Sequence, residues 1–289
     1  MYEGFERLTV DVGEARIAAV RGGEGAPVLL LHGFPQTKAM WHVVAPELTR
    51  THTVVAADLR GYGDSSRPPA DDDHSGYAFR TMAADQVELM RALGHDRFAL
   101  VGHDRGARVA HRMALDHPAV VERVALLDIL PTLHVYENVD RRVATAYYHW
   151  FFFIQPAPLP ETLIAADPTF YLHSLLGAWG NALEAFAPTA LADYARGFAD
   201  PQARHAMMED YRAAASIDLE HDRADLHRRV EVPMLVVWGS RSVVGGSGDV
   251  LGIWRERAVD LRGRAVEAGH YLAEERPGET FTELADFLG

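Results

Sequence analysis

The segment Gly102–Gly106, with the sequence GHDRG, is where residue types and spacing point most clearly to chemistry. It follows the apolar run Phe98–Val101, which predicts a buried strand, and it leads into helical spacing over Gly106–Asp116. A sharp strand-to-helix turn that presents a reactive side chain needs small residues two positions before and two positions after it. The two glycines meet this need, so we predict that the central Asp104 is a nucleophile.

An aspartate at this place could instead do no more than cap the following helix, a position that aspartate favours. The flanking glycines and the strand–turn–helix context favour the nucleophile. Free N–H groups at a helix N-terminus stabilise an anion, so Asp104 is expected to stay ionised. A carboxylate nucleophile displaces a leaving group from carbon and forms an ester, which water must then cleave. The chain must therefore also supply a base that activates water.

His270 is the predicted base, because it follows a late strand behind a glycine and comes last in the order nucleophile, acid, histidine. The acid that orients it is harder to find, since no aspartate directly follows the strand Met234–Trp238 and Asp249 has the position of a helix cap. Asp128 lies between apolar residues, where a buried carboxylate needs a partner. We predict that Asp128 orients His270; the alternative is that it caps a turn before Pro131.

Eight short apolar segments along the chain predict strands. They are Phe5–Val10, Ala15–Val20, Pro27–Leu31, Thr53–Ala57, Phe98–Val101, Val124–Leu127, Met234–Trp238 and Ala265–Glu267. Helical spacing separates the later ones, over Trp41–Arg50, Tyr77–Leu93, Gly106–Asp116, Val250–Asp260 and a closing helix to Leu288. The first two strands predict a hairpin. The alternation predicts an α/β fold, with a mostly parallel eight-stranded sheet and helices on both faces.

This alternation stops at Pro131. From about Leu133 to Arg228 the sequence is helical, aromatic and interrupted by prolines, with no buried strand. We therefore predict a helical cap domain, residues 133–228, inserted between strands 6 and 7 of a core domain of residues 1–132 and 229–289. It should lie over the carboxyl ends of the strands, where doubly wound sheets bind ligands.

Composition excludes several classes of protein. The 289 residues contain no cysteine, which excludes disulfides and thiolate chemistry. A net charge of −13 argues against nucleic acid or an anionic membrane as a partner, since both require basic patches. No segment has the roughly 18 apolar residues of a membrane span, and the first twenty residues lack a signal-like apolar run, so we expect a cytoplasmic protein. The 15 histidines form no metal-ligand pattern, and we predict no metal.

Four motifs resemble the α/β-hydrolase superfamily, in its branch of epoxide hydrolases and haloalkane dehalogenases. They are HGFP at 32–35, DLRGYGDSS at 58–66, GHDRGAR at 102–108 and AGHYLAEERP at 268–277. A narrower set resembles the fluoroacetate (haloacetate) dehalogenases. It consists of Asp104-Arg105, Arg108, Asp128 and His149-Trp150. The similarity covers nearly the whole chain.

This resemblance implies that Arg105 and Arg108 bind the carboxylate of the substrate. A guanidinium holds a carboxylate with paired hydrogen bonds, so two arginines at a helix N-terminus form a local anion site within an acidic protein. The alternative for either arginine is an ion pair with a nearby acid. We expect such a pair more for Arg108 than for Arg105, because arginines along a helix often form surface ion pairs.

The resemblance also implies that His149, Trp150 and a later tyrosine of the cap bind the departing halide. Tyr211 matches that tyrosine best, and Tyr194 is the second choice; the alternative for Tyr211 is a packed helix residue. Three converging donors in a dry pocket stabilise a halide as its charge develops. Phe34 matches the residue whose backbone N–H completes the oxyanion hole, and its ring is expected to line the pocket.

The function implied is a hydrolytic dehalogenase that converts haloacetates, fluoroacetate among them, to glycolate and halide through an ester on Asp104. No cofactor is expected, and the resemblance implies a homodimer. The first alternative is an epoxide hydrolase with the same nucleophile, which would activate its substrate with Tyr147, Tyr148 or Tyr211. The second is a non-catalytic small-molecule receptor. A serine esterase is disfavoured, because no serine occupies the turn at 102–106.

Overall fold

The computed structural model describes residues 1–179 and 183–289. Eight strands form one sheet in the order β1-β2-β4-β3-β5-β6-β7-β8. The strands are β1 (Glu6–Asp11), β2 (Arg16–Gly22), β3 (Ala26–Leu31), β4 (His52–Ala57), β5 (Phe98–His103), β6 (Val121–Leu127), β7 (Met234–Gly239) and β8 (Leu261–Val266). The pairs β1–β2 and β2–β4 are antiparallel and the other pairs are parallel. The predicted α/β fold with a mostly parallel sheet is confirmed.

The central strands end at one edge of the sheet. Leu31 of β3 pairs with Gly102 of β5, and Leu127 of β6 pairs with His103 of β5 and with Val237 of β7. These strands are buried on both faces, which explains why they are continuous apolar runs in the sequence. The loops after β3, β5, β6 and β7 therefore start side by side.

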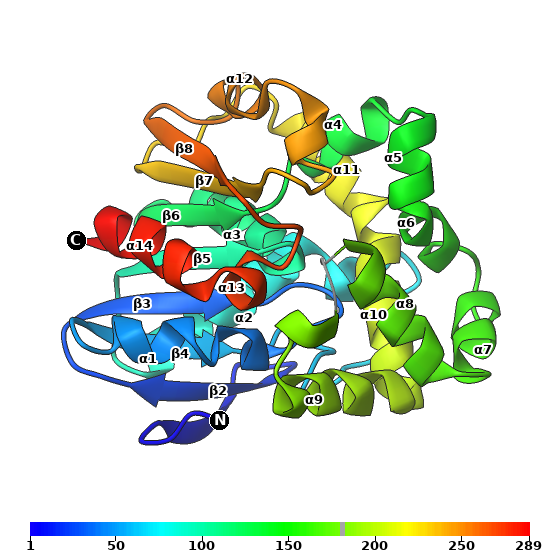
Figure 1. Ribbon diagram of the computed structural model, residues 1–289, viewed down its shortest axis with the longest axis horizontal. Coiled ribbons are helices and arrows are strands. Elements are labelled where there is room, and N and C mark those ends of the chain that lie inside the picture. The colour runs from blue at the N-terminus through cyan, green and yellow to red at the C-terminus, as the bar shows by residue number, and fades with distance from the viewer. Residues whose placement is uncertain (180–182) are drawn as a thin grey trace.

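Helices cover both faces of the sheet (Figure 1). Helix α1 (Val44–Leu48) packs against α14 (Pro277–Leu288) on one face, and α2 (Phe79–Ala92) packs against α3 (Arg105–Asp116) on the other. The remaining core helices are α12 (Val250–Arg255) and α13 (Leu272–Glu275), and short 3-10 turns include η1 (Lys38–Trp41).

The predicted boundaries of several elements were wrong, and three of them differ most clearly. The helix predicted at Trp41–Arg50 is η1 followed by α1, because a helix from Trp41 would place Pro46 in its interior, where proline removes a hydrogen bond. The helix predicted to Asp260 ends at Arg255. The strand predicted at Ala265–Glu267 is β8, which begins at Leu261; its arginines face solvent, as is usual on an edge strand, so it has no apolar run at its start.

Between β6 and β7 the described residues form helices and no strand, which confirms the predicted helical insertion. These helices are α4 (Thr132–Glu137), α5 (Arg141–Ala146), α6 (Tyr148–Phe153), α7 (Leu159–Ala165), α8 (Pro168–Trp179), α9 (Pro188–Ala199), α10 (Pro201–Ala214) and α11 (Ile217–Ala224). Figure 1 shows them, coloured green to yellow, gathered at the edge where the strands end. Within the described part of the chain, no helix combines the length and the apolar character that crossing a membrane requires.

A buried carboxyl group joins α9 to the core. The Glu274 carboxyl on α13 accepts hydrogen bonds from Tyr194 Oη at 3.1 Å and from Gln36 Nε2 at 2.5 Å. Burial raises the pKa of Glu274 to about 8, and the two donors offset only part of this. Glu274 is therefore mostly protonated near neutral pH, in contrast to an exposed glutamate.

We predict that Glu274 makes stability fall as pH rises, and that Glu274→Gln removes this dependence. The carboxyl has an ordinary pKa of 4.5 when unfolded and about 8 when folded. Between these values the unfolded chain releases a proton that the folded protein keeps, so the contribution is complete below about pH 4.5 and is lost by about pH 8. Urea denaturation should show the variant gaining free energy of unfolding relative to the parent from pH 5 to pH 8. Glu279→Gln, at an exposed site on α14, is the control; equal pH dependence in parent and Glu274→Gln would contradict the prediction.

Candidate active site

Asp104 lies at a tight turn between β5 and α3, with a backbone φ of 46°. A Cβ atom at Gly102 would lie 2.4 Å from Gly106 O, and one at Gly106 would lie 2.4 Å from His32 O. Only glycine fits at both places, as the spacing predicted. The carboxylate of Asp104 does not cap α3. It is therefore available for another role.

The loop after β3 holds this carboxylate. The backbone N–H of Phe34 donates to Asp104 Oδ1 at 2.9 Å, and a Cβ atom at Gly33 would lie 2.4 Å from Asp104 Cβ, so the two segments are in close contact. The Phe34 ring is buried and contacts the rings of Tyr211, at 5.3 Å between centroids, and of His149, at 6.1 Å. Phe34 thus donates its backbone N–H to Asp104, and its ring packs against aromatic residues of the cap.

His270 lies between Asp128 and Asp104. Its Nδ1 is 2.6 Å from Asp128 Oδ2, and its Nε2 is 3.8 Å from Asp104 Oδ2. Asp128 Oδ1 also accepts from Gly239 N at 2.8 Å and from Ser242 Oγ at 2.7 Å. Asp128 therefore contacts the predicted base rather than capping a turn before Pro131.

Asp249 and Ser242 bear on the prediction that Asp128 is the acid that orients His270. Asp249 caps α12 by accepting from Gly252 N at 2.8 Å, as its position in the sequence indicated. Ser242, which donates to Asp128, was not anticipated. The signal available in the sequence was its place in the loop after the strand Met234–Gly239, where an acid was sought and a hydroxyl stands instead.

The charges around Asp104 keep it ionised. Burial opposes ionisation, but His270 and Arg108 outweigh it and lower the pKa of Asp104 to about 2. Burial alone would lower the pKa of His270, but the hydrogen bond and charge of Asp128, with the charge of Asp104, raise it. Burial lowers the pKa of the neighbouring His103 to about 3, so that imidazole stays neutral. The site therefore holds an ionised carboxylate beside an imidazole of raised pKa.

Arg105 is not free of acidic partners, contrary to our expectation. Its side chain is fully buried, its Nε donates to Asp210 Oδ2 at 2.9 Å, and its Nη2 donates to Asp210 Oδ1 and to Asp210 O. Asp210 belongs to α10, a hundred residues further along the chain, so helical spacing around Arg105 does not reveal the pair. The Arg105 Nη1 group has no hydrogen-bond partner in the described part of the protein.

Arg108 differs from Arg105 in its partners. It forms no ion pair with the residues that the structure describes, and its Nη1 donates to Leu130 O at 3.0 Å and to Thr132 Oγ1 at 2.9 Å. Its Nε has no hydrogen-bond partner among those residues. The guanidinium carbon lies 4.7 Å from the centroid of the Trp150 ring, which connects Arg108 to the cap.

The three cap residues implied in halide binding lie together. His149, Trp150 and Tyr211 are all buried, and the Tyr211 ring centroid is 5.5 Å from that of His149 and 6.3 Å from that of Trp150. Burial lowers the pKa of His149 well below its ordinary value, so its imidazole is neutral. Tyr194, the second choice, instead donates to Glu274. Tyr211 is therefore the better placed of the two tyrosines.

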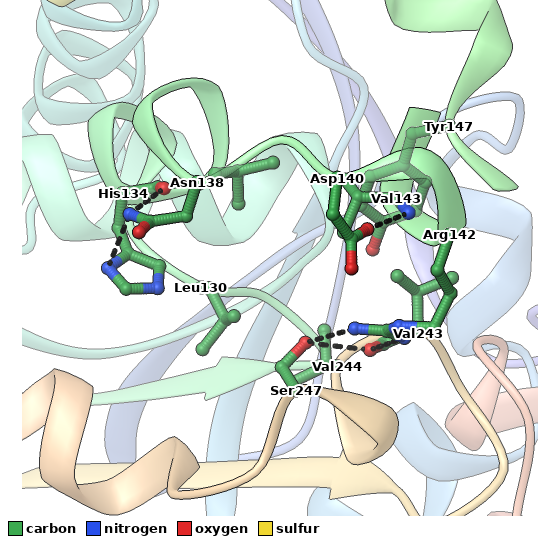
Figure 2. Close-up of a pocket in the computed structure, with 11 residues that line it drawn as sticks. Leu130, His134, Asn138, Asp140, Arg142, Val143, Tyr147, Val243, Val244 and Ser247 are labelled. Carbon is green, nitrogen blue, oxygen red and sulfur yellow. Dashed lines mark hydrogen bonds between the residues drawn. The ribbon is translucent and has the colours of Figure 1, made fainter. Parts of the chain in front are cut away.

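Two hollows lie beside this site, between the cap and the loop after β7. Figure 2 shows the first, where Tyr147 and Arg142 of the cap face Val243 and Ser247. Arg142 Nη1 donates to Val243 O at 3.2 Å, which ties α5 to the loop. The second hollow shares Tyr147 and Val243 with the first and is also lined by His270. The second hollow therefore reaches His270.

Comparison with known proteins agrees with this geometry. A family model described as the alpha/beta hydrolase fold matches residues 26–277. The chain is 50 % identical to a fluoroacetate dehalogenase from a Burkholderia species, over all of this chain and 95 % of the relative, and 34 % identical to a soluble epoxide hydrolase from a Corynebacterium species, over 91 % and 90 %. A solved α/β hydrolase from Nostoc sp PCC 7120 superposes with a TM-score of 0.98 at 56 % identity, covering 100 % of this chain and 99 % of that one. The chain therefore belongs to the α/β-hydrolase family and, within it, to the fluoroacetate dehalogenases.

Proposed function

We propose that this protein is a hydrolytic dehalogenase, which converts haloacetates such as fluoroacetate to glycolate and halide through an ester on Asp104. The observation that carries the proposal is the Asp104 carboxylate at the strained turn, held by the Phe34 N–H and 3.8 Å from His270 Nε2. A carboxylate in that place attacks carbon and becomes an ester. The 50 % identity to a fluoroacetate dehalogenase supports the same reaction.

In this proposal the substrate carboxylate binds to Arg105 and Arg108. Both arginines lie on the first turn of α3, and each has a nitrogen without a hydrogen-bond partner among the described residues, Nη1 in Arg105 and Nε in Arg108. Charge-assisted hydrogen bonds from these groups would hold a small acid with its α-carbon toward Asp104. The N-terminus of α3, the cation of Arg108 and a directed donor from Arg105 would thus accommodate an anion despite the acidic composition.

The halide leaves toward the cap. Asp104 belongs to the core, whereas His149, Trp150 and Tyr211 belong to cap helices α6 and α10, so displacement would run from core to cap. N–H and O–H donors in a buried site stabilise the charge that develops on the halogen. The electron pair of the carbon–halogen bond departs with the halide, and an Asp104 oxygen takes its place on carbon.

Water then cleaves the ester. His270 Nε2 accepts a proton from water, whose oxygen attacks the carbonyl carbon of the Asp104 ester, while Asp128 stabilises the imidazolium. The Phe34 N–H, which contacts Asp104 Oδ1, is placed to stabilise the tetrahedral oxyanion. Collapse of that intermediate releases glycolate and regenerates the carboxylate, so the cycle needs no cofactor.

We also propose that residues 133–228 form a cap domain on a core of residues 1–132 and 229–289, and that the protein is a homodimer. Several large apolar side chains of the cap are exposed, which is consistent with a partner surface. They are Tyr148, Leu159, Leu163 and Phe170, the last with 69 % of its surface accessible. A cytoplasmic location stays a prediction.

Incubation with fluoroacetate, chloroacetate and styrene oxide, with ion release and diol measured side by side, tests the function. We expect halide from the haloacetates, and Asp104→Asn or Asp104→Ala should reduce its release by at least about 10³-fold, because the nucleophile is lost. Diol without halide would instead support an epoxide hydrolase. Full activity in both variants would show that Asp104 is not the nucleophile.

Replacing the base should trap the ester. His270→Asn keeps Asp104 and the arginines but cannot accept the proton of water, so we expect one equivalent of halide per active site and then no turnover. Mass spectrometry should show one carboxymethyl group added to the intact protein and, after digestion, should locate it on the peptide that contains Asp104. His227→Asn, at an exposed histidine, should turn over normally. Continuous turnover by His270→Asn would assign the base elsewhere.

The rate should depend on pH through His270. Because His270 must be neutral to accept a proton from water, we expect kcat to fall as pH drops and the imidazole becomes protonated. The hydrogen bond and charge of Asp128 raise the pKa of His270 and so help to set the midpoint of this fall. Asp128→Asn should lower kcat by about 10²-fold or more and move the midpoint toward lower pH. Steady-state halide release from pH 5 to pH 9 measures both effects. A midpoint that Asp128→Asn leaves unchanged would show that Asp128 does not set the pKa of His270.

A further inference from the structure

Asp210 of α10 carries a buried charge that the proposed reaction does not use. Its side chain is fully buried and binds two core residues. Tyr62 Oη donates to Oδ2 at 2.6 Å, Arg105 Nε donates to Oδ2 at 2.9 Å, and Arg105 Nη2 donates to Oδ1 and, at 2.8 Å, to the main-chain oxygen. A buried carboxylate is costly unless it is paired and hydrogen-bonded, and here the pair connects cap to core.

This contact fixes the orientation of the Arg105 guanidinium. A guanidinium has a fixed fork of donors, and Asp210 occupies the edge formed by Nε and Nη2. The same group lies over the rings of Tyr211 and Phe79, with its carbon 4.3 and 4.7 Å from their centroids. The guanidinium therefore cannot turn that edge elsewhere, and Nη1 remains as the group without a partner among the described residues.

Because Asp210 pairs with Arg105 alone, the two arginines differ in net charge. Arg105 is neutralised by its ion pair, whereas Arg108 forms no ion pair within the described part of the chain. Burial lowers the pKa of Arg108, and the charge of Asp104 offsets part of this. The net positive charge that faces a bound carboxylate thus resides on Arg108, and Arg105 contributes a directed donor.

We propose that Asp210 is a positioning residue, which holds Arg105 so that Nη1 faces the substrate carboxylate and places the α-carbon in line with Asp104. The inference rests on the proposed function and deepens it. Without Asp210, Arg105 could offer its Nε–Nη2 edge instead and bind the acid with a shifted α-carbon. Misplacement of a reacting atom by about 1 Å can slow a reaction about 10²-fold, even where binding itself is not weakened.

The experiment measures ester formation in a single turnover, with chloroacetate and the His270→Asn variant as the parent. The amplitude of the halide burst counts working sites, and its rate constant reports the attack by Asp104. Adding Asp210→Asn, which keeps the shape and removes the charge, should lower the burst rate at least tenfold and leave the amplitude unchanged. A purely structural role would lower the amplitude and leave the rate alone, which would overturn the proposal.

Matched variants complete the test. Glu209→Gln alters the neighbouring buried carboxylate of α10, which pairs with Arg212 and not with Arg105, and should leave the burst rate within twofold. Asp210→Glu should restore part of the lost rate. If Asp210→Asn does not fold, Tyr62→Phe removes one donor to Asp210 but keeps the ion pair, and should slow the burst about threefold; a rate equal to that of the parent would overturn the proposal.

The result also separates the inference from the function. A burst from the parent with an unchanged rate in Asp210→Asn would overturn the role of Asp210 and leave the dehalogenase intact. No burst from the parent, together with no halide from the unmodified protein, would overturn both.

Discussion

The close approach of the loop after β3 to the turn at Asp104 is the constraint on which the site depends. Gly33, Gly102 and Gly106 each lack a Cβ atom that would lie 2.4 Å from a neighbouring atom, so backbone meets backbone where side chains usually separate the segments. This contact brings the Phe34 N–H to Asp104 and keeps the aspartate at a positive φ. A backbone conformation of this kind costs free energy, and it persists only where the surrounding packing enforces it.

The groups of the proposed reaction are divided between two parts of the chain, the core and the cap. The core supplies the proposed nucleophile, the proposed base and the two arginines, while the cap supplies the proposed halide donors His149, Trp150 and Tyr211. The Arg105–Asp210 pair crosses this boundary at the site itself, next to Tyr211 in the sequence of α10. The partner of Arg105 and the proposed halide donor Tyr211 therefore belong to the same cap helix, so a shift of α10 would affect both.

Much of this could be predicted from sequence, because it rests on local patterns and on order along the chain. Buried parallel strands are continuous apolar runs, and the turn at Asp104 is recognised by its glycines. Asp128 followed from the argument that a buried carboxylate needs a partner. Asp210 and Ser242 could not be found in this way, since each contacts a site residue more than a hundred positions away through tertiary packing alone. For the same reason the prediction that Arg105 has no acidic partner was wrong.

In the proposed mechanism, the proximity of Asp104 to His270 would allow one site to carry out two steps that need opposite charge states. Attack requires an ionised Asp104, and the charges of His270 and Arg108 outweigh burial and lower the pKa of the carboxyl to about 2. Hydrolysis requires a neutral imidazole, yet the charge of Asp104 is among the groups that raise the pKa of His270. Once the ester forms, that negative charge is gone, because an ester is neutral. In the proposed mechanism the pKa of His270 would then fall, so ester formation would itself favour the neutral imidazole that hydrolysis needs.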